Sequence, residues 1–398
     1  MHCISFDQHS HHNSPGYGTS CYRHPTLKKS NCRLIVVILF CNLFAFSAHS
    51  ADEAKPKPAV EAAKSDAEQK MIDNPKSTAK RVSEGQAFSV DVENDSKNIG
   101  GPGSDQAYSN GIKFSYVYAK DHVPFWAPRW FTDMNYMHDQ ISKAKANFGV
   151  ALNHQIFTPN NTQIRTYIPN DRPYAAWLNL ALSMQLKTPQ RSQALELSLG
   201  VVGPWAQGEG VQNTFHKMIG AQEALGWENQ IKNELAVQLS YQQRLRFVEL
   251  RNKFGSYFDL IPFFGGGLGN VYVGAHTGLM ARVGLNLPDD FGPARPSGGE
   301  SDSFVSPNPA PDDLKSSYFL FAGLRGNAVA RNIFLDGNTF EPSHSSTKYP
   351  VNFETEVGVG IQFMPVSIIW RYVVRSPDFE ENSGFNSFAS LGLSYYTH

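Results

Sequence analysis

Long runs of strict alternation between apolar and polar residues limit the fold of this chain more than any other feature. The longest run, 351–363, carries Val, Phe, Thr or Ile at every second position and is ended by Pro365. Shorter runs of the same kind cover 195–201, 235–242 and 391–396. Successive side chains of a β-strand point to opposite faces of its sheet. The periodicity therefore predicts a sheet with one apolar and one polar face.

The length of the runs distinguishes a membrane barrel from a soluble sandwich. Strands of soluble proteins average about 5–6 residues, whereas a tilted strand needs about 9–11 residues to cross a bilayer. The longest alternating run reaches the second length. A mean hydropathy of -0.35 is lower than a helical membrane protein would have, so any membrane structure should be built from strands. The pattern predicts an all-β fold, a transmembrane antiparallel β-barrel.

Thirteen segments after residue 85 have the composition of strands. Bacterial single-chain barrels have even strand counts, so we expect about 12 spanning strands and expect one candidate not to be a separate strand. The candidates are 86–93, 108–120, 146–157, 173–188, 191–203, 234–249, 255–267, 268–287, 316–330, 331–343, 351–364, 365–377 and 386–397.

The connections between these candidates differ in length. Two are tight, at 188–190 and at the Met364-Pro365 corner, and three are long, at 121–145, 204–233 and 288–315. Short periplasmic turns and longer extracellular loops are typical of outer-membrane barrels. We therefore expect the long connections on the extracellular side of a Gram-negative outer membrane.

The first 85 residues predict two segments that precede the barrel. Residues 34–46 are apolar, follow a basic region and lead to Ala48-His49-Ser50, which predicts a signal peptide with an extended n-region over 1–50. Residues 51–85 are rich in Ala, Lys, Glu, Asp and Pro and lack aromatic residues, which predicts a disordered periplasmic tail. A short Ala-rich helix is the alternative there. The barrel is predicted over 86–398.

Composition also excludes several classes of function. The formal net charge is -1, and no basic patch with interleaved aromatic residues is present, so no nucleic-acid partner is expected. All four cysteines lie within the first 41 residues, in the predicted leader. The rest of the chain therefore offers no disulfide, no thiolate zinc site and no cysteine nucleophile.

A dense group of polar residues lies between two strand candidates, over 200–234. Gln212 and His216 are four residues apart and would share one face of a helical turn. A neutral imidazole in that position can take a proton from water as a general base. Gln222 and Glu223 follow closely enough to reach the same cavity. A lone His in a loop is also common on protein surfaces, so this pattern by itself leaves both readings open.

Oxygen-bearing side chains lie at the facing ends of the first two strand candidates. Asn94 and Asp95 close the first, and Ser109 is near the start of the second. Together these oxygens would suit a hard cation such as Ca²⁺. A bound cation would polarise an ester carbonyl and stabilise the oxyanion. Taken singly, each cluster is equally typical of a turn.

Taken in order, these motifs resemble the lipid A 3'-O-deacylase family of Gram-negative outer membranes. The resemblance covers about residues 86–398. It rests on Glu93-Asn94-Asp95, Tyr108-Ser109-Asn110-Gly111, the segment from Asp171 to Leu178, Gly203-Pro204 with Gln212 and His216, and Gly226-Trp227 with Asn229, Gln230 and Glu234.

The resemblance implies a calcium-dependent hydrolase that removes the 3'-O-linked acyloxyacyl group from lipid A. It makes His216 the base that activates water. It also implies that Asn94 and Asp95 line the site and that Gln212 supports the imidazole or the substrate. Ser109 stands where the family usually has Thr and keeps the oxygen.

The resemblance leaves the carboxylate ligand of the metal between two neighbours. Glu223 is preferred over Gln222 because it carries a charge, so Glu223 and Ser109 are the expected metal residues. Arg172 is a candidate for the basic residue near the substrate. Lipid A of lipopolysaccharide and outer-membrane lipid are the expected partners, and the protein is expected to act as a monomer.

Two other functions are consistent with a barrel. An outer-membrane phospholipase would need a Ser nucleophile beside a His, and the strand candidates carry no such pair, while His344-Ser345 reads as a loop. A non-enzymatic, porin-like barrel would conduct ions, but twelve strands leave a narrow lumen that side chains largely fill.

Overall fold

The computed structural model describes residues 86–95, 107–119, 124–125, 145–294, 316–382 and 384–397, which form a barrel with short helices. The predicted signal peptide and tail lie outside these residues. The strands are β1 (Gln86–Asn94), β2 (Ala107–Val117), β3 (Lys145–Thr158), β4 (Ala175–Lys187), β5 (Arg191–Val202), β6 (Glu234–Leu245), β7 (Val248–Asn252), β8 (Gly255–Gly269), β9 (Tyr272–Leu285), β10 (Ser317–Asn332), β11 (Val351–Phe363), β12 (Val366–Arg375) and β13 (Asn386–Thr397). The helices are η3 (Pro204–Ala206), α4 (Gly208–Ile219), η4 (Trp227–Asn229) and α5 (Ile333–Asp336).

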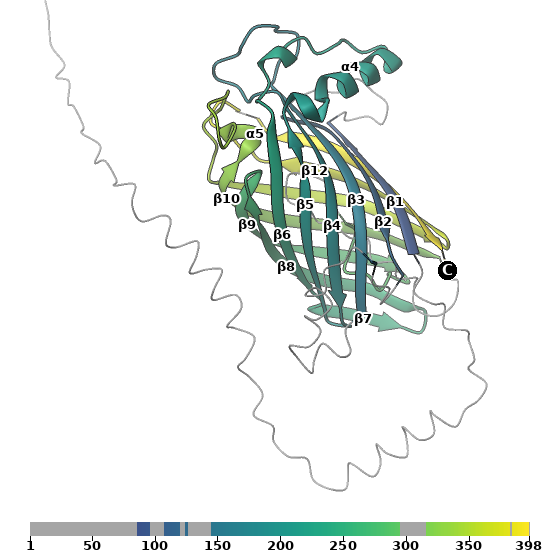
Figure 1. The fold of residues 1–398 in the computed structure, drawn as a ribbon. Helices are drawn as coiled ribbons and strands as arrows, with labels where there is room; N and C mark the ends of the chain where they lie inside the picture. Colours follow the sequence, from purple (N-terminus) through teal and green to yellow (C-terminus); the bar gives the residue numbers. More distant parts are fainter. Residues whose placement is uncertain are drawn as a thin grey trace, which may run out of the picture. The chain divides into compact units, whose positions relative to one another are not determined.

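Twelve of these strands close into one antiparallel barrel (Figure 1). Each of these twelve strands pairs with the next one along the chain, β6 pairs with β8, and β1 pairs with β13. The short β7 pairs only with β8 and does not span the wall. The predicted twelve-stranded barrel is confirmed. The surplus candidate is 331–343, because β10 continues to Asn332 and α5 follows at once.

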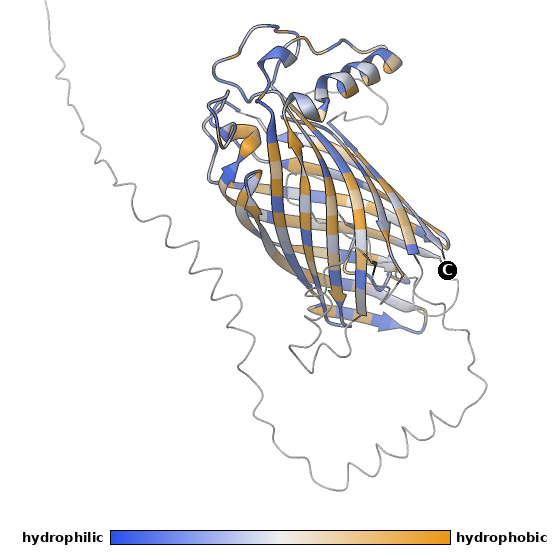
Figure 2. Ribbon diagram, in the orientation of Figure 1, coloured by the Kyte–Doolittle hydropathy of each residue, from blue (hydrophilic) through white to orange (hydrophobic). Residues whose placement is uncertain are grey.

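The two faces of the wall differ as the alternation predicts. Outward-pointing residues such as Leu180, Leu199 and Val237 are exposed, which gives the wall the apolar bands of Figure 2. Many inward-pointing residues are polar, and some bond to one another, as where Asn153 Nδ2 donates to Asn179 Oδ1 at 2.9 Å. None of the helices in the described ranges is long and apolar enough to cross a bilayer.

The barrel has a helical end, which carries α4 and α5, and a terminal end, which carries Gln86 and Thr397. Strands alternate in direction, so the connections after β2 and β9 join strand ends at the terminal end, beside the tight turns at 188–190 and 364–365. The connection 203–233 lies at the helical end. The prediction that the three long connections share one side is therefore wrong. Length alone does not reveal strand direction.

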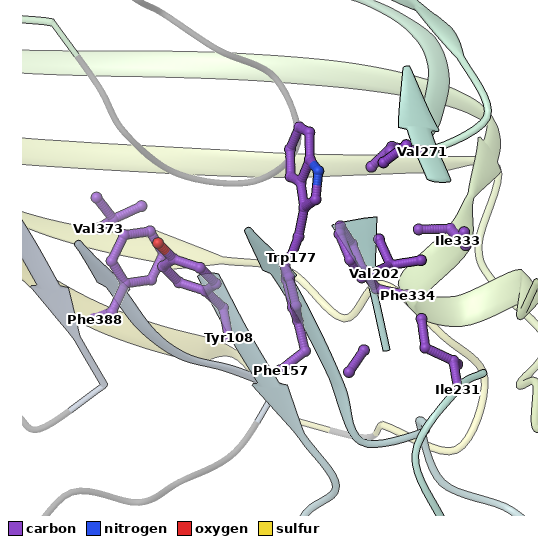
Figure 3. Close-up of a cluster of buried hydrophobic side chains, with 12 residues drawn as sticks. Tyr108, Phe157, Trp177, Val202, Ile231, Val271, Ile333, Phe334, Val373 and Phe388 are labelled. Atoms are coloured by element: carbon purple, nitrogen blue, oxygen red, sulfur yellow. The ribbon is translucent and has the colours of Figure 1, made fainter. Parts of the chain in front are cut away.

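Apolar side chains fill the lumen at the helical end (Figure 3). The short α5 places Phe334 against Phe157 of β3, with ring centroids 4.0 Å apart and an interplanar angle of 17°. Tyr108 packs on Phe157 and on Phe388, which draws β2, β3 and β13 together around the same cluster. Burial of Phe334 explains why 333–336 leaves the wall instead of extending a strand.

The segment 287–294 fills the lumen at the terminal end. Leu287 and Phe291 are buried in a cluster with residues of β8, β9 and β10. Arg371 donates to the carbonyl oxygen of Ala294 at 2.9 Å, and Arg244 donates to that of Phe291 at 2.7 Å. We call 287–294 the lumen segment. Side chains and backbone thus occupy the interior near both ends of the barrel.

Candidate functional site at the outer wall

Helix α4 packs on the outer face of the wall at the helical end. Leu152 of β3 and Leu180 of β4 point outward and are exposed. Ile156 and Ala176 lie four residues away on the same two strands, so they also point outward. These last two are buried in a cluster with Trp227 of η4. The loop that carries α4 therefore covers a part of the wall that would otherwise face lipid.

His154 of β3 attaches this loop to the wall. Its Nε2 lies 2.8 Å from the carbonyl oxygen of Ala206, at the end of η3. Since a carbonyl oxygen only accepts, Nε2 carries the proton. His154 is buried on the outward side of β3, an unusual position for an imidazole in a membrane barrel. The alternation of β3 could have revealed it, because a His at an outward position of a barrel strand must be covered by protein.

Gly208 sets how closely α4 approaches the wall. A Cβ atom at Gly208 would lie 2.4 Å from a ring carbon of Trp227 and 2.6 Å from the Cβ of Ala176. Both neighbours belong to the buried cluster and cannot move independently. Only glycine therefore fits at this contact.

We expect Gly208→Ala to displace α4 and cost about 1–3 kcal/mol, as overpacking does. Limited proteolysis of the 203–233 connection would report the displacement. Gly210→Ala is the matched control, since a Cβ there would meet nothing closer than an atom at 3.9 Å. Equal protease resistance of the two variants would contradict the packing argument.

Gln212 and His216 lie together on the buried stripe of α4, as their spacing predicts. Gln212 Oε1 accepts a hydrogen bond from Trp227 Nε1 at 2.9 Å. Because Gln212 sits one turn before His216, Trp227 indirectly fixes the face of α4 that carries the imidazole. Trp227 is therefore a positioning residue to which sequence reasoning gave no role.

The chain reverses directly after α4 and returns to His216. Gly220 has a φ of 71°, a left-handed conformation that ends the helix. The carbonyl oxygen of Gln222 then lies 2.5 Å from His216 Nδ1. Because that oxygen can only accept, Nδ1 carries the proton and the lone pair of the neutral ring is on Nε2. The turn thus sets the tautomer of the proposed base.

Asn94, Asp95 and Ser109 are brought together by the pairing of β1 with β2. The backbone N–H of Asp95 donates to the Ser109 carbonyl oxygen at 3.2 Å, and Asn94 Nδ2 donates to the same oxygen at 3.3 Å. Ser109 Oγ lies 2.5 Å from Thr158 Oγ1 at the end of β3. Asp95 is buried. These groups lie at the helical end of the barrel, close to the end of β3. Helix α4 also contacts β3.

Glu223 is placed differently from Asp95. Its side chain is exposed and forms an ion pair with Lys217, with 3.3 Å between Nζ and Oε2. The described residues contain no group of three or more His, Cys, Asp or Glu that could hold a metal ion. Hard oxygen donors lie at the helical ends of β1, β2 and β3. They are the carboxylate of Asp95, the amide oxygen of Asn94 and the hydroxyl groups of Ser109 and Thr158. This donor chemistry fits Ca²⁺.

Arg172 is buried among aromatic rings and does not reach the surface. Its guanidinium carbon lies 5.1 Å from the ring centre of Phe157, and Nη1 lies 3.6 Å from Asp378 Oδ2. Burial lowers the pKa of Arg172, and the charge of Asp378 partly offsets this. The contacts tie the connection 159–174 to the loop after β12. They give Arg172 a structural partner in place of an exposed substrate-facing position.

Comparison with known proteins finds a matching family and similar solved structures. The family model described as "Outer membrane protein LpxR" matches residues 45–397. The structure of LpxR from Salmonella typhimurium is similar with a TM-score of 0.60 and 20% identity, over 78% of this chain and 100% of that one. The β domain of the Bordetella autotransporter BrkA gives a TM-score of 0.37 at 10% identity, over 78% of this chain and 97% of that domain. No curated protein matches the sequence.

A closed twelve-stranded barrel with an apolar outer wall defines an outer-membrane protein of a Gram-negative bacterium. Because the family model matches most of its length, the chain belongs to the LpxR family of outer-membrane proteins. The resemblance found in the sequence is thereby confirmed at the level of the family.

Proposed function

We propose that this protein is a lipid A 3'-O-deacylase, an ester hydrolase in which His216 activates the attacking water. The observation that carries the proposal is the contact of His216 Nδ1 with the carbonyl oxygen of Gln222. It leaves the lone pair of the neutral imidazole on Nε2, as a general base requires. Membership of the LpxR family supports lipid A as the substrate.

The residues around His216 would divide the work of ester hydrolysis. The imidazole would take a proton from water at Nε2 while the Gln222 carbonyl stabilises the charge that develops on the ring. Gln212, fixed by Trp227, would hold the helix face toward the substrate. The position of α4 on the outer wall favours a substrate that arrives from the membrane over one that arrives through the lumen.

Asn94, Asp95 and Ser109 are the residues we propose to hold Ca²⁺. When bound, the ion would polarise the ester carbonyl. Asp95 is the buried carboxylate of this group. Glu223 remains a candidate only if its carboxylate leaves Lys217, so the structure favours Asp95 as the principal charged ligand.

We expect excess EDTA to abolish hydrolysis and added Ca²⁺ to restore it. Mg²⁺ should restore less, because it demands a smaller and more regular octahedral site. The retained gel mobility of the unheated barrel would show that EDTA has not unfolded it. Undiminished activity in EDTA would remove the metal from the proposal and leave His216 in place.

The direct test is incubation of the purified protein with lipid A and Ca²⁺, followed by mass spectrometry of the lipid. Loss of the 3'-acyloxyacyl group is expected. Release of fatty acid from phospholipids without any change in lipid A would favour the phospholipase alternative. Steady ion conductance in planar bilayers would favour a porin, but the filled lumen predicts none.

A further inference from the structure

The exposed side of α4 carries a stripe of apolar residues that no part of the described chain covers. Val211, Phe215, Met218 and Ile219 follow the spacing i, i+4, i+7 and i+8, which places them on one face of the helix. Their exposed fractions are 42%, 46%, 79% and 44%. We call these four residues the apolar stripe. Contact of such an apolar surface with water is unfavourable.

Helix α4 has a buried, an apolar and a polar face, which follow one another around the helix in a definite order. Gly208, Gln212 and His216 form the buried stripe. Val211 and Phe215 come directly before the buried residues Gln212 and His216 in the sequence. Asn213 and Lys217 come directly after them. The buried stripe therefore runs between an apolar side and a polar side of the helix. An arrangement of this kind is typical of a helix that lies in a membrane interface.

The apolar stripe continues a surface that already faces lipid. Leu178 and Val201 of the wall pack against the cluster that seats α4. Leu180 and Leu199, one step further along the same outward rows of β4 and β5, are exposed. Since the barrel spans the outer membrane, those rows contact acyl chains. Helix α4 lies beside the ends of the strands at the helical end (Figure 1) and contacts β3 and β4, so it lies at the edge of the same apolar layer.

We propose that α4 is an interfacial helix whose apolar stripe inserts into the acyl-chain layer of the outer membrane. Its occupant is membrane lipid, and this part of the proposal depends on the fold and location alone. If the proposed function also holds, His216 lies between the lipid-facing and water-facing sides of the helix. That boundary is the depth at which an ester joins acyl chains to a lipid headgroup.

Site-specific fluorescence would test the insertion. The four native cysteines, all within the first 41 residues, would be changed to Ser. A single cysteine would then be introduced by Met218→Cys or Phe215→Cys and labelled with NBD. Lys217→Cys, an exposed position on the polar side of the helix, is the matched control. Each labelled protein would be folded into vesicles of phosphatidylcholine and phosphatidylglycerol.

We expect labels at 215 and 218 to emit at shorter wavelength than the label at 217. Brominated acyl chains should quench them, and aqueous iodide should quench the label at 217 more strongly. Equal iodide quenching at 217 and 218 would overturn the proposal.

Activity gives a second, separate readout. In a Phe215→Asp, Met218→Asp variant, deacylation of lipid A in vesicles should fall while the folded barrel persists. Insertion by fluorescence with no deacylase activity in the parent protein would reject the proposed function and keep the interfacial helix. Deacylase activity in the parent protein without insertion by fluorescence would reject the interfacial helix and keep the proposed function.

Discussion

Replacement of His216 by Gln should lower the rate of lipid A deacylation by about 10²–10⁴-fold, the usual contribution of a general base. Gln retains hydrogen-bonding groups and similar bulk but cannot take a proton from water at neutral pH. The side chain lies in the connection 203–233, outside the strand pairing of the wall, so the barrel should fold normally. Mass spectrometry of lipid A after timed incubation gives the rate.

His344→Gln is the matched control for this experiment. His344 also lies in a connection at the helical end, and its Nε2 lies 3.0 Å from the carbonyl oxygen of Asp171. Burial lowers the pKa of His344, and its contacts with Asp171 offset part of that effect. It has no place in the proposed chemistry, so its replacement should change the rate only slightly. Equal rates in the two variants would remove His216 from the mechanism.

Replacement of Arg282 by Met should destabilise the barrel by about 3–5 kcal/mol, because it leaves the buried carboxylate of Asp259 and the partly buried one of Asp290 without their counter-charge. Arg282 is fully buried on β9. It donates to Asp259 from Nε at 2.9 Å and from Nη2 at 2.6 Å, and its Nη1 pairs with Asp290 of the lumen segment. The same guanidinium thus joins the wall to the segment that fills the lumen.

Urea unfolding in detergent micelles would measure the loss, with the gel mobility of the unheated protein as a check of folding. An additional Asp259→Asn replacement should recover part of the stability, since a neutral amide needs no counter-charge. Recovery in the double variant would assign the effect to charge. An Arg282→Met barrel as stable as the parent would mean that water reaches Asp259 and Asp290 and solvates them.

Local patterns were sufficient for the strands and for the short-range part of the site. Alternation over 351–363 predicted β11, since side-chain direction in a strand depends only on position along the chain. Asn94, Asp95 and Ser109 could be expected to meet because they belong to the facing ends of adjacent strands. The spacing of Gln212 and His216 likewise placed them on one helix face.

Long-range packing decided what the local patterns left open. Residues 331–343 resemble a strand, but Phe334 gains more contact by stacking on Phe157 inside the lumen, so the chain leaves the wall at Ile333. The side on which each long connection lies follows from the order and direction of all the strands before it. Neither property is encoded in a short window of residues.

The sequence by itself determined a twelve-stranded outer-membrane barrel and a His-bearing helix between two of its strands, because periodicity fixes which face each residue occupies. Only the tertiary structure decided that α4 packs on the outer wall, where Gly208 and Ala176 permit close contact. It also placed the Gln222 carbonyl against His216 and the Glu223 carboxylate against Lys217. The first outcome depends on contact between segments far apart in the chain, and the other two depend on the turn at Gly220. Alternation carries no information about either.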